Sequence, residues 1–146
     1  MSVKSRRNNI VSALVEKLKD IDGTNNFNTN LFTNAYSGLK FWDQVNDFPS
    51  VYAVSGQEIR EYLPGDFKWG YLAISIKVYC KGEDSSADLE ALLEDIESVV
   101  DDNRVLVYND NGDSTTEILV TSIVTDEGLL APYAIGEMNL QVRYAL

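Results

Sequence analysis

Two segments of the chain have hydrophobic residues with a period of two, which is the pattern of half-buried β-strands. In residues 71–79 the hydrophobic face consists of Leu72, Ile74, Ile76 and Val78. In residues 134–144 it consists of Ala134, Met138, Leu140, Val142 and Tyr144. Because neighbouring side chains of a strand point to opposite faces, each segment should bury one face in a core and leave the other to solvent or to a partner.

Two other segments have hydrophobic residues at intervals of three and four, which predicts amphipathic helices. The first covers residues 5–21, with a stripe formed by Ile10, Leu14, Leu18 and Ile21. The second covers residues 85–100, with a stripe formed by Leu89, Leu92, Leu93, Ile96, Val99 and Val100. Ser85 is placed to cap this second helix, with Asp88 three residues later. The opposite face is acidic, and we expect it to be a solvated surface formed by Glu90, Glu94, Asp95 and Glu97.

Shorter hydrophobic runs predict the rest of the sheet. Residues 51–54 predict a short strand, which residues 59–63 continue after a turn at Ser55 and Gly56. Asn111 and Gly112 predict a hairpin turn. In the strand that follows, the pattern places Ile118, Val120 and Val124 on one side, and Leu119 and Ile123 on the other. The order of elements predicts an α+β fold: a mostly antiparallel sheet with two main helices packed on one face.

Residues 24–50 lack any period but contain many aromatic residues among Asn, Thr and Ser. The segment is too long and too aromatic for an idle linker. It is either a flap that closes the domain's own core or a surface that becomes ordered against a partner. The length of 146 residues is typical of one domain. We therefore expect a single domain that carries this irregular, aromatic-rich insertion.

The charge balance is acidic, with 12 Lys and Arg against 23 Asp and Glu, a net charge of −11. This excess argues against a protein that grips nucleic acid. An acidic surface serves solubility, or lines a conduit through which DNA passes without sticking. Lys4, Arg6 and Arg7 gather at the start of the first helix, where the helix dipole disfavours cations. They are either solvated there or in contact with an acidic partner.

Residue chemistry gives no catalytic constellation. Cys80 is the single cysteine and the chain has no histidine to activate it. The string from Asp110 to Asp113 resembles a calcium loop only in composition, because neither possible frame has Glu at its twelfth position. No hydrophobic run approaches the roughly 20 residues of a membrane span. We expect a soluble, cytoplasmic protein that is not an enzyme, with no cofactor, metal or membrane partner.

The order of these elements resembles the tail terminator family of long-tailed bacteriophages, also called minor tail protein U or, in contractile tails, the sheath terminator. The resemblance spans nearly the whole chain and rests on order and hydrophobicity rather than on an invariant chemical residue. It is carried by residues 6–14, 49–52, 71–79, 88–97 and 136–144.

The resemblance implies a structural protein that forms a hexameric ring. Such a ring caps the tail tube, stops its polymerisation and offers its other face to the head–tail connector. The partners would be further copies of the chain, the tail tube protein, a sheath protein if the tail contracts, and a connector or neck protein. DNA would pass through the lumen without specific binding. The protein would be assembled in the host cytoplasm and reside in the tail or neck of the virion.

Under this resemblance, two groups of residues are candidates for contacts. Intersubunit or tail-facing contacts would come from Lys4, Arg6, Arg7, Phe32, Tyr36, Phe41 and Trp42. The lumen or its rim would be lined by Glu83, Asp84, Asp110 and Asp113.

Two alternatives remain open at the level of sequence. The chain could be another phage protein, such as a neck, head-completion or tail tube subunit, which would form open-ended polymers or bind the portal alone. It could instead be a small enzyme or ligand-binding α+β domain, which would require a pocket with convergent polar groups.

Overall fold

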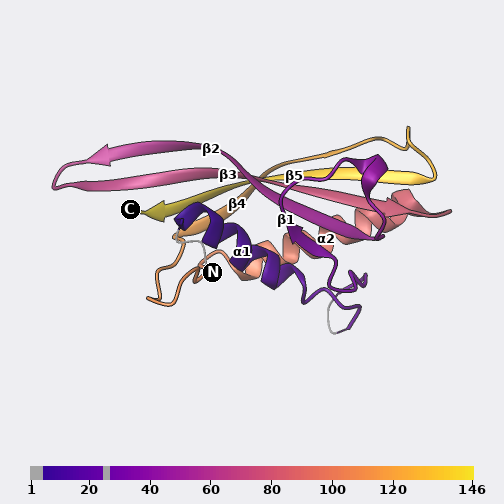
Figure 1. Ribbon diagram of the computed structural model, residues 1–146, viewed down its shortest axis with the longest axis horizontal. Helices are drawn as coiled ribbons and strands as arrows, with labels where there is room; N and C mark the ends of the chain where they lie inside the picture. Colours follow the sequence, from indigo (N-terminus) through magenta and orange to yellow (C-terminus); the bar gives the residue numbers. More distant parts are fainter. Residues whose placement is uncertain (1–4, 25–26) are drawn as a thin grey trace.

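A five-stranded sheet with two helices on one face forms the protein (Figure 1). The computed structural model describes residues 5–24 and 27–146. In this part of the chain the elements are α1 (Arg6–Leu18), β1 (Ala35–Ser37), the 3-10 helix η1 (Trp42–Gln44), β2 (Ser50–Leu63), β3 (Phe67–Lys81), α2 (Ser85–Asp102), β4 (Glu117–Thr125) and β5 (Tyr133–Ala145). The strand order is β1-β2-β3-β5-β4, and only β1 runs parallel to its neighbour. The predicted α+β fold is confirmed.

The main core lies between the sheet and the two helices. The predicted inner face of β3, from Leu72 to Val78, is at most 1% exposed. The inner face of β5 is equally buried, as the alternation predicted. The helices complete the core with Ile10, Leu14, Leu18, Leu89, Leu92, Ile96 and Val100. Burial of these side chains is what holds α1 and α2 against the sheet.

The start of α2 differs from the prediction. Ser85 is not the cap but the first helical residue, and its side chain is buried. Asp84 occupies the cap position, where its carbonyl accepts a hydrogen bond from the Asp88 backbone N–H over 2.9 Å. The Asp84 side chain makes no capping hydrogen bond. The helix therefore begins one residue earlier than the serine signal indicated.

The predicted turn at Ser55 and Gly56 is wrong, because β2 passes through it without interruption. Ser55 pairs with Ile74 and Glu58 pairs with Leu72, so β2 has one extra residue between them. An extra residue of this kind is a β-bulge, which bends a strand without ending it. The two predicted fragments are thus one strand, and β2 and β3 form a hairpin that extends well beyond α1 (Figure 1).

A second bulge, between Val120 and Ser122, corrects the predicted faces of β4. Ile123 pairs with Met138 and therefore lies on the helix side with Ile118 and Val120. Val124 pairs with Glu137 and turns to the opposite face. Strict alternation gave the reverse for these two residues, because a bulge shifts the side-chain period by one.

The turn predicted at Asn111 and Gly112 is confirmed. Gly112 has φ +83°, and an antiparallel bridge joins Val107 to Ser114 across the turn. The Asn109 carboxamide oxygen accepts hydrogen bonds from the backbone N–H groups of Asn111 (3.1 Å) and Asp113 (3.0 Å). The loop that looked like a calcium site is held by its own side chains.

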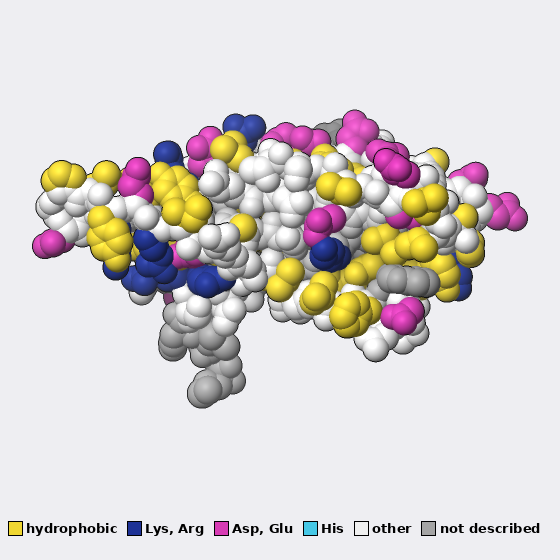
Figure 2. All heavy atoms as spheres, turned by 90° about the horizontal axis from the view of Figure 1, so that it is seen from above, with side chains coloured by type: hydrophobic (Ala, Val, Ile, Leu, Met, Phe, Trp, Pro, Cys, Tyr) yellow, Lys and Arg dark blue, Asp and Glu magenta, His cyan; other side chains and the backbone are white. Residues whose placement is uncertain are grey.

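The insertion closes the core at one end of the molecule. Leu31 and Ala35 are buried in the main core. Val45 and Phe48 pack with Tyr52 and Tyr79 in a second, smaller core on the sheet face that the helices leave open. Figure 2 shows this open face, where hydrophobic side chains gather at both ends and a largely uncharged surface lies between them. The flap interpretation therefore holds for the inward side chains of the segment.

Candidate assembly surfaces

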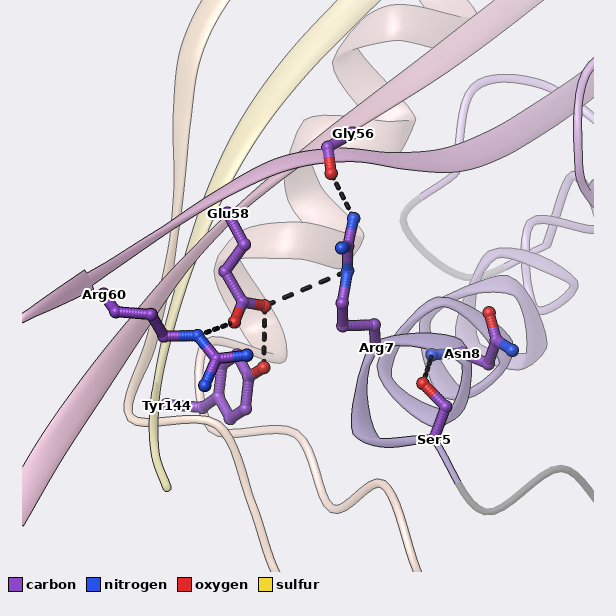
Figure 3. A network of polar contacts seen from close by, with 7 residues as sticks. All are labelled: Ser5, Arg7, Asn8, Gly56, Glu58, Arg60 and Tyr144. Carbon is purple, nitrogen blue, oxygen red and sulfur yellow. Dashed lines mark hydrogen bonds and ion pairs between the residues drawn. The ribbon is translucent and has the colours of Figure 1, made fainter.

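A buried carboxylate joins the root of the hairpin to α1 and β5 (Figure 3). Glu58 follows the β2 bulge, and its side chain is only 4% exposed. It accepts a 2.7 Å hydrogen bond from the Tyr144 hydroxyl and forms an ion pair with Arg60. Arg7 places its Nε 4.0 Å from Glu58 and donates a hydrogen bond to the Gly56 carbonyl. Two guanidinium groups and a phenol thus surround one carboxylate.

Tyr144 fits this site only because β3 has glycine at position 70. A Cβ atom on Gly70 would lie 2.8 Å from Cε1 of Tyr144, which is closer than packed carbon atoms approach. Burial, and then the hydrogen bond to Glu58, raise the pKa of the Tyr144 phenol well above its usual range. The phenol therefore remains a proton donor to Glu58 at neutral pH.

The basic residues at the start of α1 have separate environments. Arg7 faces Glu58, an acidic residue of its own chain, and its side chain is 39% exposed. Arg6 is exposed. Burial and the charge of Asp113 raise the pKa of the Tyr108 phenol, and the charge of Arg6 opposes them. Lys4 lies outside the described residues.

The tip of the hairpin exposes hydrophobic side chains. Ile59, Leu63 and Phe67 lie on the open face of the sheet, and Phe67 is 69% exposed. Tyr62 lies on the other face, where the Lys68 ammonium is 5.5 Å from its ring centroid. The turn between β2 and β3 is a tight one through Gly65. Hydrophobic groups gathered at an exposed tip are typical of contact surfaces.

At the opposite end of β3, a hollow of about 290 Å³ opens between the insertion and α2. Phe32, Phe48 and Leu92 give it hydrophobic walls, and Lys81 and Asp88 add one charge of each sign. Lys81 and Asp88 are both exposed. A larger hollow of about 620 Å³ between α1 and β2 has no charged side chain among its lining residues.

Asp95 contradicts the prediction of a solvated acidic face, because it is only 2% exposed. Its carboxylate accepts hydrogen bonds from the backbone N–H groups of Asn28 (3.0 Å) and Thr29 (2.8 Å) and from the Thr29 hydroxyl (2.6 Å). The insertion crosses α2 here, and its backbone donors need an acceptor. Glu90 and Glu94 are exposed and Glu97 is half-buried.

The aromatic candidates of the insertion are distributed over different surfaces. Phe32 is exposed at the edge of the hollow, and Phe41 is exposed beside η1. Tyr36 stacks on Tyr52 with ring centroids 5.2 Å apart. A 2.8 Å hydrogen bond from Tyr36 to Asp47 raises the pKa of the Tyr36 phenol. Trp42 lies in η1, and its side chain is outside the described part of the structure.

The four acidic lumen candidates form two separate pairs. Glu83 and Asp84 are exposed just before α2, whereas Asp110 and Asp113 are exposed in the loop that follows α2. A helix of 18 residues is about 27 Å long. The structure therefore places one acidic pair beyond each end of α2 and does not bring the two pairs together.

Cys80 should be chemically inert in the folded protein. Burial, and then the charge of Asp88, raise the pKa of its thiol from 9.0 to about 12. At pH 8 the thiolate is then about a thousandfold rarer than in the unfolded chain. We expect iodoacetamide to alkylate native protein far more slowly than protein unfolded in urea, as measured by mass spectrometry. Equal alkylation rates for native and unfolded protein would contradict the burial.

The raised thiol pKa also affects the stability of the fold. Ionisation of Cys80 leaves the free energy of unfolding unchanged below pH 9 and lowers it as the pH rises from 9 towards 12, because only the unfolded chain loses the proton in that range.

The described residues contain neither a cluster of metal-binding side chains nor a membrane-spanning helix. Among them, no three His, Cys, Asp or Glu side chains are grouped so as to hold a metal ion. No helix in the same part of the chain is long and hydrophobic enough to cross a membrane.

Comparisons with known proteins identify the family. The family model for the Bacteriophage Tail Tube Terminator Protein matches residues 4–146. Tail tube terminator protein p142 of Escherichia phage T5 is 36% identical over an alignment of 149 positions, which covers 94% of this chain and 92% of that protein. A chain in the solved virion of a native gene transfer agent particle has the same fold. It has a TM-score of 0.68 and 10% identity, with 99% of this chain and 100% of that chain covered.

The match over nearly the whole chain places the protein in a class of phage structural proteins. The chain belongs to the bacteriophage tail tube terminator protein family. It is therefore a structural component of the phage virion tail and not an enzyme. The family resemblance predicted from the order of elements is confirmed. The residues that anchor its surfaces, Glu58 and Asp95, were not recognised in the sequence.

Proposed function

We propose that the protein forms a hexameric ring on the last ring of the tail tube, stops tube polymerisation and presents its other face to the head–tail connector. The observation that carries this proposal is the match to tail tube terminators along residues 4–146. The name of the T5 relative gives the partner, which is the tail tube. In a contractile tail the sheath would be a further partner.

Termination requires a subunit with two different faces. One face must bind the end of the tube, and the other must not accept another tube ring. A closed ring meets this requirement when unlike surfaces of neighbouring copies meet head to tail, because all copies then have the same orientation and the two faces of the ring differ. The exposed hairpin tip and the exposed aromatic residues of the insertion are unlike surfaces of this kind. Within such a ring, the candidates for contacts between copies or with the tube remain the aromatic residues Phe32, Tyr36, Phe41 and Trp42 and the basic residues Lys4, Arg6 and Arg7.

The acidic excess suits the passage of DNA through such a ring. Like charges repel, so a lumen with exposed carboxylates would let DNA move without adhesion. Glu83, Asp84, Asp110 and Asp113 are the candidates for the lumen or its rims. Because the two pairs lie beyond opposite ends of α2, they would serve two rims rather than one.

The test is a polymerisation assay with purified tail tube subunits. We expect added protein to shorten the tubes in proportion to its concentration and to leave a cap at one end, as seen by electron microscopy. Tube subunits alone, and tube subunits with an equal amount of urea-unfolded protein, are the controls. Unchanged lengths with bare ends would contradict the proposal and favour a head-completion protein.

A further inference from the structure

The tip of the β2–β3 hairpin carries an aromatic residue between two opposite charges. Phe67 is strongly exposed, and its chain neighbours Asp66 and Lys68 supply an acidic and a basic group. Asp66 has φ +64°, in the left-handed region that glycine adopts most readily and that Asp tolerates better than most other residues. The turn thus holds Phe67 at the free end of the hairpin, beside Gly65 and outside both hydrophobic cores of the described residues.

The hollow between the insertion and α2 has the complementary chemistry. Phe32, Phe48 and Leu92 supply hydrophobic walls, and Lys81 and Asp88 supply one charge of each sign. The Lys81 ammonium lies 5.1 Å from the Tyr133 ring centroid and 5.9 Å from that of Phe48, at the edge of the hollow. An aromatic side chain flanked by an acid and a base would find both hydrophobic surface and opposite charges here.

The two features cannot meet within one molecule. Phe67 and Lys81 are the first and last residues of β3. A strand of 15 residues separates its ends by about 46 Å. In Figure 1, β3 runs along most of the long axis of the molecule, with the tip of the β2–β3 hairpin at one end and the insertion at the other. The tip can reach such a hollow only on a second copy of the chain.

We propose that the hairpin tip of each copy inserts Phe67 into the hollow of the next copy. Asp66 then faces Lys81, and Lys68 faces Asp88. The contact joins unlike surfaces of identical chains, so it is head to tail and closes into a ring when the rotation between copies permits. This inference rests on the proposed ring and assigns one of its contacts. The hydrophobic insertion supplies affinity, and the two charge pairs fix the register.

Photo-cross-linking tests the contact in the full-length protein. Benzoylphenylalanine in place of Phe67 keeps an aromatic group at the tip and reacts with whatever lies beside it. We expect dimer adducts, both in concentrated protein and on capped tubes. Their cross-linked peptides should map to residues 28–32, 48–49 or 81–92. Benzoylphenylalanine in place of Val105, an exposed residue of another loop, is the control and should give no adduct in these peptides.

Charge reversal sharpens the same measurement. Lys68→Glu and Asp88→Lys should each lower the yield of the Phe67-site adduct about fivefold, because each variant places like charges together. The two substitutions combined in one chain should restore the yield. A thermal melt of each variant shows whether it folds. A double variant no better than the single ones would overturn the assigned pair of Lys68 and Asp88.

The outcomes separate this inference from the proposed function. Adducts with the tube subunit, adducts elsewhere on a second copy, or no adducts on capped tubes would each overturn the hairpin contact. In all three cases shortened tubes would still support termination. Adducts at the hollow without shortened tubes would support the contact and contradict the terminator function.

Discussion

Replacing Glu58 with alanine should lower the free energy of unfolding by about 2–3 kcal/mol. The substitution removes the one carboxylate that Arg60, Arg7 and Tyr144 share. It leaves the buried Tyr144 hydroxyl without its acceptor, and an unsatisfied buried polar group costs about 1–3 kcal/mol by itself. Urea unfolding followed by circular dichroism measures the change.

Glu61→Ala is the matched control for this variant. Glu61 is three residues further along β2, is exposed, and accepts a 3.0 Å hydrogen bond from the exposed hydroxyl of Tyr71. Its loss should cost less than about 1 kcal/mol, as is usual for a surface interaction. Equal losses for Glu58→Ala and Glu61→Ala would show that the buried network contributes no special stability at the hairpin root.

Asp95→Ala should lower the free energy of unfolding by about 2–4 kcal/mol. Hydrogen bonds to a charged group contribute about 1.5–3 kcal/mol each, and they are not fully additive. Asp95 accepts hydrogen bonds from two backbone N–H groups, from the Thr29 hydroxyl and from the Asn28 carboxamide. The substitution should also release the backbone of Asn28 and Thr29 from α2.

Amide hydrogen exchange gives a local measurement of this release. The Asn28 and Thr29 amides should exchange much faster in Asp95→Ala, whereas amides in the centre of β3 should lose protection only by the global destabilisation. Glu94→Ala, on the neighbouring exposed position of α2, should leave both amides protected. Protected amides at Asn28 and Thr29 in Asp95→Ala would contradict the anchoring role.

Asp95 also bears on the proposed contact between copies. Asn28 and Thr29, which it anchors, line the hollow that should receive Phe67. The anchor therefore lies behind the receiving surface, where it fixes the position of one wall before any partner arrives. Preformed walls of this kind reduce the entropy lost on association.

The regular elements could be predicted because their signals are local. In residues 71–79 every second residue is hydrophobic, and in residues 134–144 only Gly136 interrupts this period. Each segment buries one face against the helices. The helical stripes of α1 and α2 have the same origin. The order of elements and their hydrophobic pattern then sufficed for the α+β fold and for the family resemblance, since both depend on these long periodic segments.

The bulges could not be predicted, and they change which residues face the core. One extra residue in β2 joins two predicted fragments into a hairpin strand and leaves Glu58 facing Tyr144. One extra residue in β4 exchanges the faces of Ile123 and Val124. A bulge is fixed by pairing with a distant strand, so strict alternation along one segment does not reveal it.

The roles of Glu58 and Asp95 could not be predicted, because their partners lie in distant parts of the chain. Asp95 occupies the acidic side of an amphipathic helix, where composition favours solvent, yet a loop more than 60 residues earlier covers it. Likewise, the hollow combines Phe32, Lys81 and Asp88 from three elements. The sequence marked the insertion as a contact surface or a flap, and only the fold shows that its inner side chains close the core.

The most direct test of the central claim is an averaged electron-microscopy image of tube ends formed in the presence of the protein. The proposed function predicts a single closed ring with six-fold symmetry at one end of each tube, and no further tube ring beyond it. Bare ends, or copies of the protein distributed along the tube wall, would contradict the claim that this chain terminates the tail tube as a hexameric ring.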